Sequence, residues 1–205
     1  TAAAGWPMLG RALPQQPAAQ PGRTEPGLRV KDIRRTTLKV PYRTVPARNM
    51  ARELPHWKYI EVFEVELASG HVGFGETLLW YTFQATVDKN VAFARGKNAA
   101  AIMWDDELGA GLQMALFDAV GKSAGVPIHR LLGTQYREDC PVSWWAQDME
   151  PLLWAREAAS AERLGFTTMK VKARPWFDIE DQLEAVTEAT SDHFQLDADF
   201  NGLLL

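Results

Sequence analysis

The second half of the chain alternates short apolar runs with longer amphipathic stretches. The runs predict strands at 142–146, 168–172 and 194–199, and the stretches predict helices at 150–164 and 178–189. Asp178, with Asp181 three residues later, is suited to begin the second of these helices. A strand, a helix and a further strand in this order are typical of a parallel sheet, whose faces are usually both covered.

The first half follows a different pattern. Apolar and polar residues alternate over 28–40, 59–67 and 71–76, and Ser69-Gly70 between the last two predicts a hairpin. Helical spacing predicts helices at 82–95, 107–124 and 128–132. Residues 41–55 contain three prolines and are interpreted as a long connection. These elements predict an α+β unit.

The chain is therefore divided into three parts. Residues 1–26 are rich in Pro, Ala and Gln and are expected to form a flexible tail. Residues 27–139 form the α+β unit, and residues 140–205 contain three βα strands. A closed β/α barrel needs eight strands and about 250 residues, so this one is expected to be incomplete, as in the front part of a longer protein.

Composition narrows the classes of partner. The 205 residues are 46% hydrophobic and 23% charged, with a formal net charge of −4, so we expect no nucleic-acid partner. Cys140 is the single cysteine, which excludes an internal disulfide. Apolar runs are too short to span a membrane, and no membrane partner is expected. We expect a cytoplasmic protein, or an exported one if a signal was removed before Thr1.

Two lysines share one face of a predicted strand. Side chains alternate along a strand, so Lys170 and Lys172 point one way while Met169 and Val171 point the other. On the next strand Asp197 and Asp199 are expected to point to the same side as the two lysines. Asn201 continues this alternation just past the end of the strand. One interpretation is a pair of solvated strand ends with ordinary salt bridges. The other is an active site, because these sites lie at the C-terminal ends of barrel strands.

Two further motifs carry a resemblance to a known family. Residues 115–133 read A-L-F-D-A-V-G-K-S-A-G-V-P-I-H-R-L-L-G, and residues 73–76 read G-F-G-E. With Lys-x-Lys and the following Asp-x-Asn, the chain resembles the enolase superfamily, in its mandelate racemase and muconate lactonizing branch. The resemblance covers nearly everything from Leu28 onward. It implies an α+β capping domain followed by the first part of a (β/α) TIM-like barrel.

The resemblance also implies roles for residues. Lys172 matches the catalytic base, and Lys170 the neighbouring lysine that holds its charge state and the substrate carboxylate. Asp199 matches the first of three carboxylate ligands of Mg²⁺. Asp197 is an alternative ligand if the family pattern is shifted by two residues. We prefer Asp199, because with this alignment Leu196 and Asn201 also match the pattern. The other two ligands and the partner acid or base are not found in these residues.

Several other residues are expected near the substrate. Asn201 and His56 are predicted substrate contacts. Trp80 and Tyr81 follow the hairpin, where pocket wall and plain core are equally good interpretations. Arg174 and Trp176 follow the lysine strand and either touch the substrate or cap the next helix. The 41–55 connection is expected to act as a lid over the barrel mouth.

The resulting prediction is Mg²⁺-dependent removal of a proton alpha to a carboxylate, giving an enolate. Acid-sugar dehydration, cycloisomerisation and racemisation all stay open. One alternative is a Schiff-base barrel aldolase, and another is a non-catalytic binding module. The partner is a small carboxylate substrate, and a homo-oligomer is expected at full length. The 205-residue chain alone is expected to be inactive.

Overall fold

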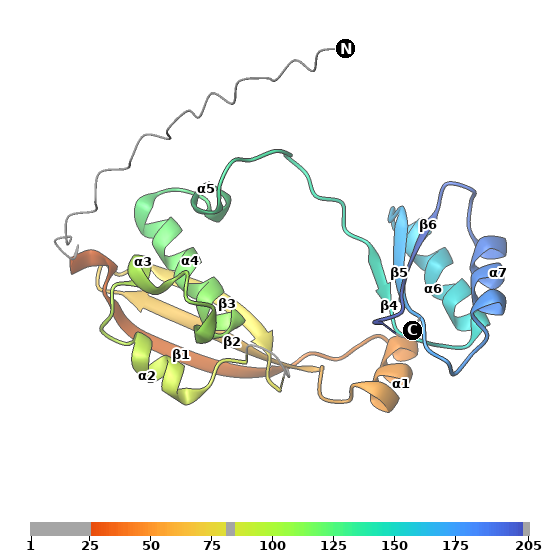
Figure 1. The fold of residues 1–205 in the computed structure, drawn as a ribbon, viewed down its shortest axis with the longest axis horizontal. Coiled ribbons are helices and arrows are strands. Elements are labelled where there is room, and N and C mark those ends of the chain that lie inside the picture. The colour runs from red at the N-terminus through yellow and green to blue at the C-terminus, as the bar shows by residue number, and fades with distance from the viewer. Residues whose placement is uncertain (1–25, 81–84, 203–205) are drawn as a thin grey trace, which may run out of the picture.

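The computed structural model describes residues 26–80 and 85–202. Figure 1 shows two units, each built around a three-stranded sheet. Within the described part of the chain, no helix is long and apolar enough to cross a membrane. The expected tail and the expected domain limits stay predictions.

The first sheet is antiparallel and has the order β1-β2-β3. Its strands are β1 (Val30–Lys39), β2 (Tyr59–Leu67) and β3 (Val72–Leu78). The hairpin at Ser69-Gly70 is confirmed, with Glu66 opposite Val72. One face of the sheet is apolar because Phe63, Val65 and Leu67 alternate with polar residues and are fully buried.

Helix α4 (Ala110–Ala124) covers the apolar face of this sheet. It lies close because β3 has glycine where it passes beneath the helix: a Cβ at Gly73 would be 2.1 Å from the carbonyl oxygen of Ala115. Gly125 then ends α4 in the left-handed region, with φ of 68°. The remaining elements are short: η1 (Pro26–Leu28), α2 (Asp88–Ala94), α3 (Ala99–Ile102), η2 (Asp106–Leu108) and α5 (Ile128–Leu132).

Two predicted helices are shorter than expected. Of the 82–95 prediction, residues 82–84 lie outside the described residues, and the helix begins only at Asp88 because Val87 is extended. The 107–124 prediction is divided into η2 and α4 at Gly109, whose φ of 83° interrupts the helical path. The prediction at 128–132 is confirmed.

The second sheet is parallel and has the order β4-β5-β6. Its strands are β4 (Trp144–Ala146), β5 (Thr168–Lys172) and β6 (Gln195–Asp199), separated by α6 (Pro151–Arg163) and α7 (Ile179–Ala189). Strand β4 starts two residues later than predicted because its pairing with β5 begins at Trp144. The side chain of Asp178 caps α7 by accepting from the backbone N–H of Glu180 at 2.8 Å, as expected.

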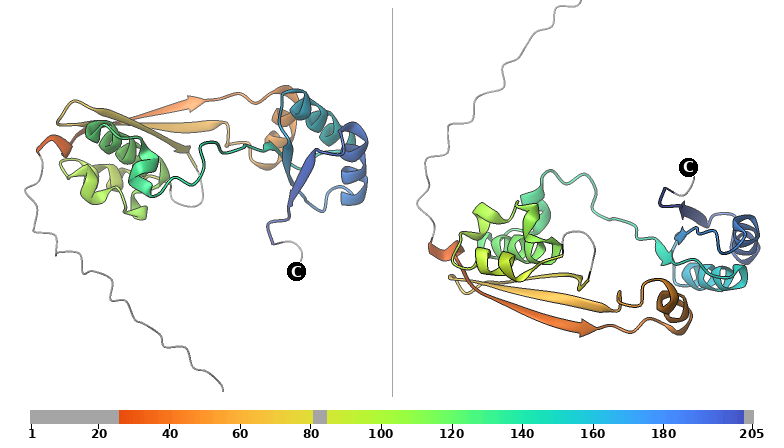
Figure 2. Two further views of the ribbon diagram at one scale, coloured as in Figure 1. Left: turned by 90° about the horizontal axis from the view of Figure 1, so that it is seen from above. Right: turned by 60° about the horizontal axis from the view of Figure 1, so that its bottom comes forward.

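Helices α6 and α7 pack together beside this sheet, as Figure 2 shows. Met169 and Val171 of β5 are fully buried with Trp154 and Val186 from these helices. Lys170 and Lys172 alternate with these buried residues along β5 and are partly exposed. The predicted division of β5 into an apolar face and a lysine face is therefore confirmed.

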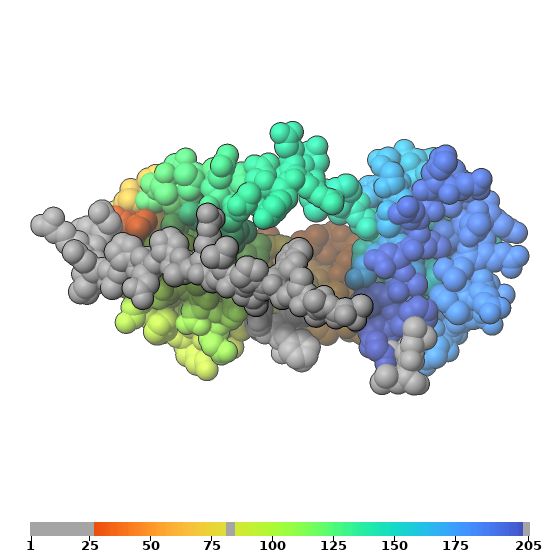
Figure 3. Space-filling view, turned by 45° about the horizontal axis from the view of Figure 1, so that its top comes forward, coloured from red at the N-terminus to blue at the C-terminus, as the bar shows by residue number. Residues whose placement is uncertain are grey.

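The 41–55 connection contains a helix that the sequence analysis missed. Helix α1 (Thr44–Glu53) follows β1 but lies beside the second sheet (Figure 1). Val45 packs against the second core, and Arg43 forms an ion pair with the buried Glu157 of α6. Pro46 falls in the first turn, where a helix tolerates proline. Residues 133–143 make the other connection between the two units (Figures 1 and 3).

Candidate active site

The candidate site lies at the C-terminal ends of β5 and β6. Parallel pairing sets Lys170 opposite Asp197 and Lys172 opposite Asp199. The Nζ atom of Lys172 is 2.6 Å from Oδ2 of Asp199, and the Nζ atom of Lys170 is 3.1 Å from the same oxygen. Both predicted lysines therefore meet the predicted metal ligand.

Asn201 completes this cluster. Its Oδ1 atom accepts from Nζ of Lys172 at 2.9 Å and from Nη2 of Arg174 at 3.0 Å. Its backbone N–H donates to Oδ1 of Asp199 at 2.9 Å, which closes a tight turn in which Asn201 has a φ of 49°. Asparagine tolerates this left-handed conformation better than most residues. We call these five residues the lysine cluster: Lys170, Lys172, Arg174, Asp199 and Asn201.

Positive charge dominates the lysine cluster. The cluster contains three basic side chains and one carboxylate, and two of the basic side chains, Lys170 and Lys172, contact the carboxylate of Asp199. The side chain of Lys172 is 16% exposed against 39% for Lys170. The hydrogen bond from Lys172, together with those from the Asn201 backbone and Lys170, holds the pKa of Asp199 well below its usual range. The carboxylate is therefore ionised at neutral pH, and the surrounding charge favours an anionic ligand.

Asp197 lies apart from these contacts. It is exposed, and within residues 26–80 and 85–202 it forms no ion pair with either lysine. Strand parity alone left Asp197 and Asp199 as alternatives, whereas the structure brings only Asp199 to the lysines.

The described residues do not by themselves fit a magnesium ion. Among them, no three His, Cys, Asp or Glu side chains group closely enough to hold a metal. Asp199 offers one carboxylate, and both of its oxygens already accept hydrogen bonds from the protein. Magnesium prefers octahedral oxygen coordination, which a single engaged carboxylate does not supply.

The other predicted substrate contacts lie in the first unit. The ring of His56 meets Trp80 edge-on, with centroids 6.5 Å apart, and Tyr59 meets the same indole at 5.5 Å. Trp80 is 58% exposed, so it is not plain core. No hydrogen bond, ion pair or ring contact in the described part of the chain joins His56 or Trp80 to the lysine cluster. Tyr81 lies outside the described residues.

A pocket of about 760 Å³ adjoins the lysine cluster, between the end of α1 and the segments that follow β4 and β5. It is lined by Arg52, Glu53, Leu54, Gln147, Arg174, Trp176 and Phe177. Arg174 and Trp176 thus line a pocket. The residue that caps α7 is Asp178. Sequence reasoning missed Gln147, although a polar residue directly after a parallel strand is a recognisable signal.

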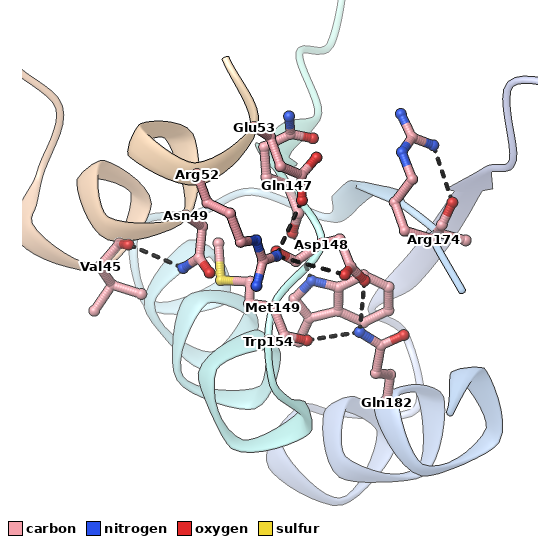
Figure 4. A network of polar contacts seen from close by, with 11 residues as sticks. Val45, Asn49, Arg52, Glu53, Gln147, Asp148, Met149, Trp154, Arg174 and Gln182 are labelled. Atoms are coloured by element: carbon pink, nitrogen blue, oxygen red, sulfur yellow. Dashed lines mark hydrogen bonds and ion pairs between the residues drawn. The ribbon is translucent and has the colours of Figure 1, made fainter. Parts of the chain in front are cut away.

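A network of polar contacts holds α1 against the floor of this pocket (Figure 4). Arg52 forms ion pairs with Glu53 at 3.0 Å and with the buried Asp148 at 3.7 Å. Gln182 of α7 donates to Oδ1 of Asp148 at 3.0 Å and to the carbonyl of Met149 at 2.6 Å. Burial raises the pKa of Asp148 above its ordinary value.

Two curated relatives match parts of the chain. N-succinyl-L-Arg/Lys racemase from Bacillus cereus is 32% identical over 94 residues, which cover 45% of this chain and 25% of the racemase. D-galactonate dehydratase from Xanthomonas oryzae pv. oryzae is 26% identical over 154 residues, or 66% of this chain and 40% of the dehydratase. No family profile matches the chain.

Solved structures share the fold. A mandelate racemase/muconate lactonizing enzyme from Roseiflexus sp. superposes with a TM-score of 0.64 at 16% identity, over 84% of this chain and 52% of that one. Dipeptide epimerase from Enterococcus faecalis V583, complexed with Mg and the dipeptide L-Leu-L-Tyr, gives a TM-score of 0.64 at 21% identity, over 84% and 54%. The chain thus spans about half the length of these proteins.

The fold and the sequence relatives together indicate the class of protein. These relatives belong to the enolase superfamily, and the chain resembles them in the lysine cluster and in the motifs at 73–76 and 115–133. Its fold is similar to that of mandelate racemase/muconate lactonizing enzymes over about half of their length.

Proposed function

We propose that the complete protein removes a proton alpha to the carboxylate of a small organic acid. The observation that carries this proposal is the lysine cluster, in which Lys172 and Lys170 meet Asp199 at the ends of adjacent parallel strands. Similar proteins named racemase, epimerase and dehydratase add support, because each of these reactions can start with removal of an alpha proton to form an enolate.

In the proposed reaction Lys172 is the base. Once the ammonium group of Lys172 has given up its proton, the amine takes the proton from the alpha carbon, the C–H bond breaks, and the electron pair of that bond moves onto the carboxylate to form an enolate. The ammonium group of Lys170 lies beside the same oxygen of Asp199, so positive charge is already in place where negative charge develops. Return of a proton to the carbon completes a racemisation, and loss of a neighbouring group completes an elimination.

We also propose that Mg²⁺ is the cofactor of the complete protein and that Asp199 is one of its ligands. An ionised carboxylate is a ligand that suits Mg²⁺, and the epimerase structure of similar fold contains Mg. The remaining ligands would come from the length of the relatives that this chain does not span.

Exchange of the alpha proton with deuterated solvent tests this function. The complete protein with Mg²⁺ should incorporate deuterium into at least one of three candidate acids, followed by NMR: N-succinyl-L-lysine, L-Leu-L-Tyr or D-galactonate. Lys172→Ala should abolish the exchange, because no other described side chain occupies its position between Asp199 and Asn201. Lys89→Ala is the matched control, since Lys89 is an exposed lysine on α2 in the other unit.

The alternative functions predict different results. A Schiff-base aldolase would be trapped on a lysine by borohydride and would keep its activity in a chelator. A binding module would bind an acid without exchanging its proton. Near-normal exchange by Lys172→Ala would remove Lys172 as the base.

A further inference from the structure

The first observation is a second cavity, of about 190 Å³, which lies between α1 and the segments that join α1 to β1 and β2. We call it the α1 cavity. Helix α1 contributes Ala47, Met50 and Ala51 to its lining, whereas it contributes Arg52 and Glu53 to the 760 Å³ pocket beside the lysine cluster. Among the described residues the two linings have no member in common, so the α1 cavity is a separate place on the molecule.

The second observation is that the α1 cavity carries charge of one sign. Lys39 and Lys58 line it, and no acidic residue of the described chain does so. Within residues 26–80 and 85–202 neither lysine side chain forms an ion pair or a hydrogen bond, although the ammonium group of Lys58 lies 5.6 Å from the centre of the Tyr59 ring. A cleft with two cations and no counter-charge attracts anions.

The third observation concerns the rest of the lining, which is mainly apolar. Its apolar members are Pro41, Ala47, Met50, Ala51 and Pro55. Tyr42 adds a hydroxyl group, and burial raises the pKa of Tyr42 above its ordinary value, so this group stays protonated at neutral pH and can donate a hydrogen bond. Because an apolar cavity of about 150 Å³ can hold a benzene ring, the α1 cavity has room for a ring that carries a carboxylate.

We infer that the α1 cavity binds a small organic acid with an apolar body, such as an aromatic monocarboxylate. The carboxylate would lie between Lys39 and Lys58, and the ring would pack against Met50. The bound anion would join the ends of β1 and β2 to α1, and it would thereby stabilise the position of the helix whose last turn lines the pocket beside the lysine cluster. This binding requires no part of the proposed reaction.

NMR of the complete protein, with ¹³C-labelled methionine methyl groups, tests the inference. Benzoate and benzamide have nearly the same shape but differ in charge. Benzoate should shift the methyl signal of Met50, which is 2% exposed and lines the cavity, and should bind about fivefold more tightly than benzamide. The signals of Met149 and Met169, which are buried in the second core, should stay in place and are the internal controls.

Variants separate the cavity from general charge effects. The double variant Lys39→Gln/Lys58→Gln should bring the ratio of the two affinities close to one, while Lys89→Gln, an exposed position on α2, should keep it. Ala51→Leu leaves both lysines in place but fills the cavity with a larger side chain, so neither probe should shift Met50 in this variant. Melting temperatures show that each variant is folded.

Lys172→Ala separates the α1 cavity from the lysine cluster, which also favours anions. The shift of Met50 and the preference for benzoate should both persist in this variant, because Lys172 does not line the cavity. Loss of either one would mean that the anion acts from the lysine cluster, and the inference would be rejected.

Three other results would also overturn the inference. They are a Met50 signal that benzoate does not move in the wild-type protein, a preference for benzoate that is absent there or persists in the folded double variant, and an unchanged Met50 shift in the folded Ala51→Leu variant. None of these measurements follows a proton on the substrate. The deuterium-exchange assay therefore tests the proposed function independently of this site.

Discussion

The contacts of the candidate site converge on the carboxylate of Asp199. It lies between two ammonium groups and the backbone of Asn201, whereas Asp197, two residues earlier on the same strand, is exposed. The difference follows from register: Asp199 stands opposite Lys172 at the strand end, where side chains can converge. The two aspartates should therefore differ in function.

Substituting the two aspartates separately tests this difference. In the complete protein, Asp199→Asn should weaken Mg²⁺ binding by more than about tenfold, because a ligand charge is lost. Asp197→Asn should leave the affinity unchanged and serves as the matched control. Both affinities are measured by calorimetry. The reverse result would mean that Asp197 is the ligand and that the proposed register is wrong by two residues.

Asp148 should make stability depend on pH. Burial raises its pKa in the folded state above 3.8, although Gln182 and Arg52 act in the opposite direction. Its contribution to stability is therefore fully present below pH 3.8 and is lost as the pH rises through the raised folded-state value. At neutral pH the folded protein contains a buried charge that costs free energy.

Asp148→Asn measures this cost, because asparagine keeps the shape and can still accept from Gln182. The melting temperature of the variant minus that of the wild-type protein should be more positive at pH 7 than at pH 4. Taking the difference cancels the titration of other groups. The loss of the ion pair with Arg52 lowers mainly the value at pH 7, where Asp148 is ionised, and burial outweighs this loss because the net shift of the pKa is upward. An identical difference at the two pH values would show that Asp148 is not buried as a charge.

At the scale of elements, α1 is the segment that joins the two units. It leaves the end of β1, yet its contacts are with the second unit: Arg43 with Glu157, and Arg52 with Asp148. Its last turn forms one wall of the pocket. That residues 41–55 act as a lid over the barrel mouth stays a prediction.

Limited proteolysis tests the lid. Cleavage within residues 41–55 should slow when substrate and Mg²⁺ bind the complete protein, because a closed helix is a poor protease substrate. Glu157→Gln should accelerate cleavage of the free protein up to roughly fivefold, since a partly exposed ion pair contributes up to about 1 kcal/mol. Arg34→Gln removes an ion pair with Glu64 on the first sheet and is the control. A rate of cleavage that stays the same when substrate and Mg²⁺ are added, and also in Glu157→Gln, would show that residues 41–55 are a passive connection.

At the scale of the whole molecule, the chain has two separate hydrophobic cores. One lies between the antiparallel sheet and α4, and the other lies between the parallel sheet and helices α6 and α7. Val45 of α1 packs against the second core although β1, the strand that precedes α1, belongs to the first sheet. The molecule should therefore open as two cooperative parts, with α1 in the second.

Hydrogen exchange of the native protein tests this division. Val45→Ala should cost about 1–2 kcal/mol and accelerate the exchange of amides in β5 and α6, while those in β2 and α4 keep their protection. Leu112→Ala, in the first core, is the reciprocal control and should act on β2 and α4. Equal acceleration throughout the molecule after Val45→Ala would show a single cooperative unit.

Local patterns in the sequence determined most of the elements and the centre of the site. Strands 59–67 and 168–172 have the predicted bounds, because one apolar face and one polar face are properties of each strand by itself. The same period-two rule, applied to two parallel strands, predicted that Lys170 and Lys172 share a face with Asp197 and Asp199, and the family pattern then favoured Asp199. Family motifs in the sequence were enough to predict the class of protein.

Only the tertiary structure decided α1 and the pocket. Prolines at 41, 46 and 55 indicated a long connection, whereas the helix is stabilised by partners such as Asp148, 96 residues from Arg52. The pocket likewise combines Arg52, Gln147 and Arg174 from three separate segments. Periodicity reports the environment of one element, while contacts between distant segments depend on how the intervening chain packs, which no local pattern contains.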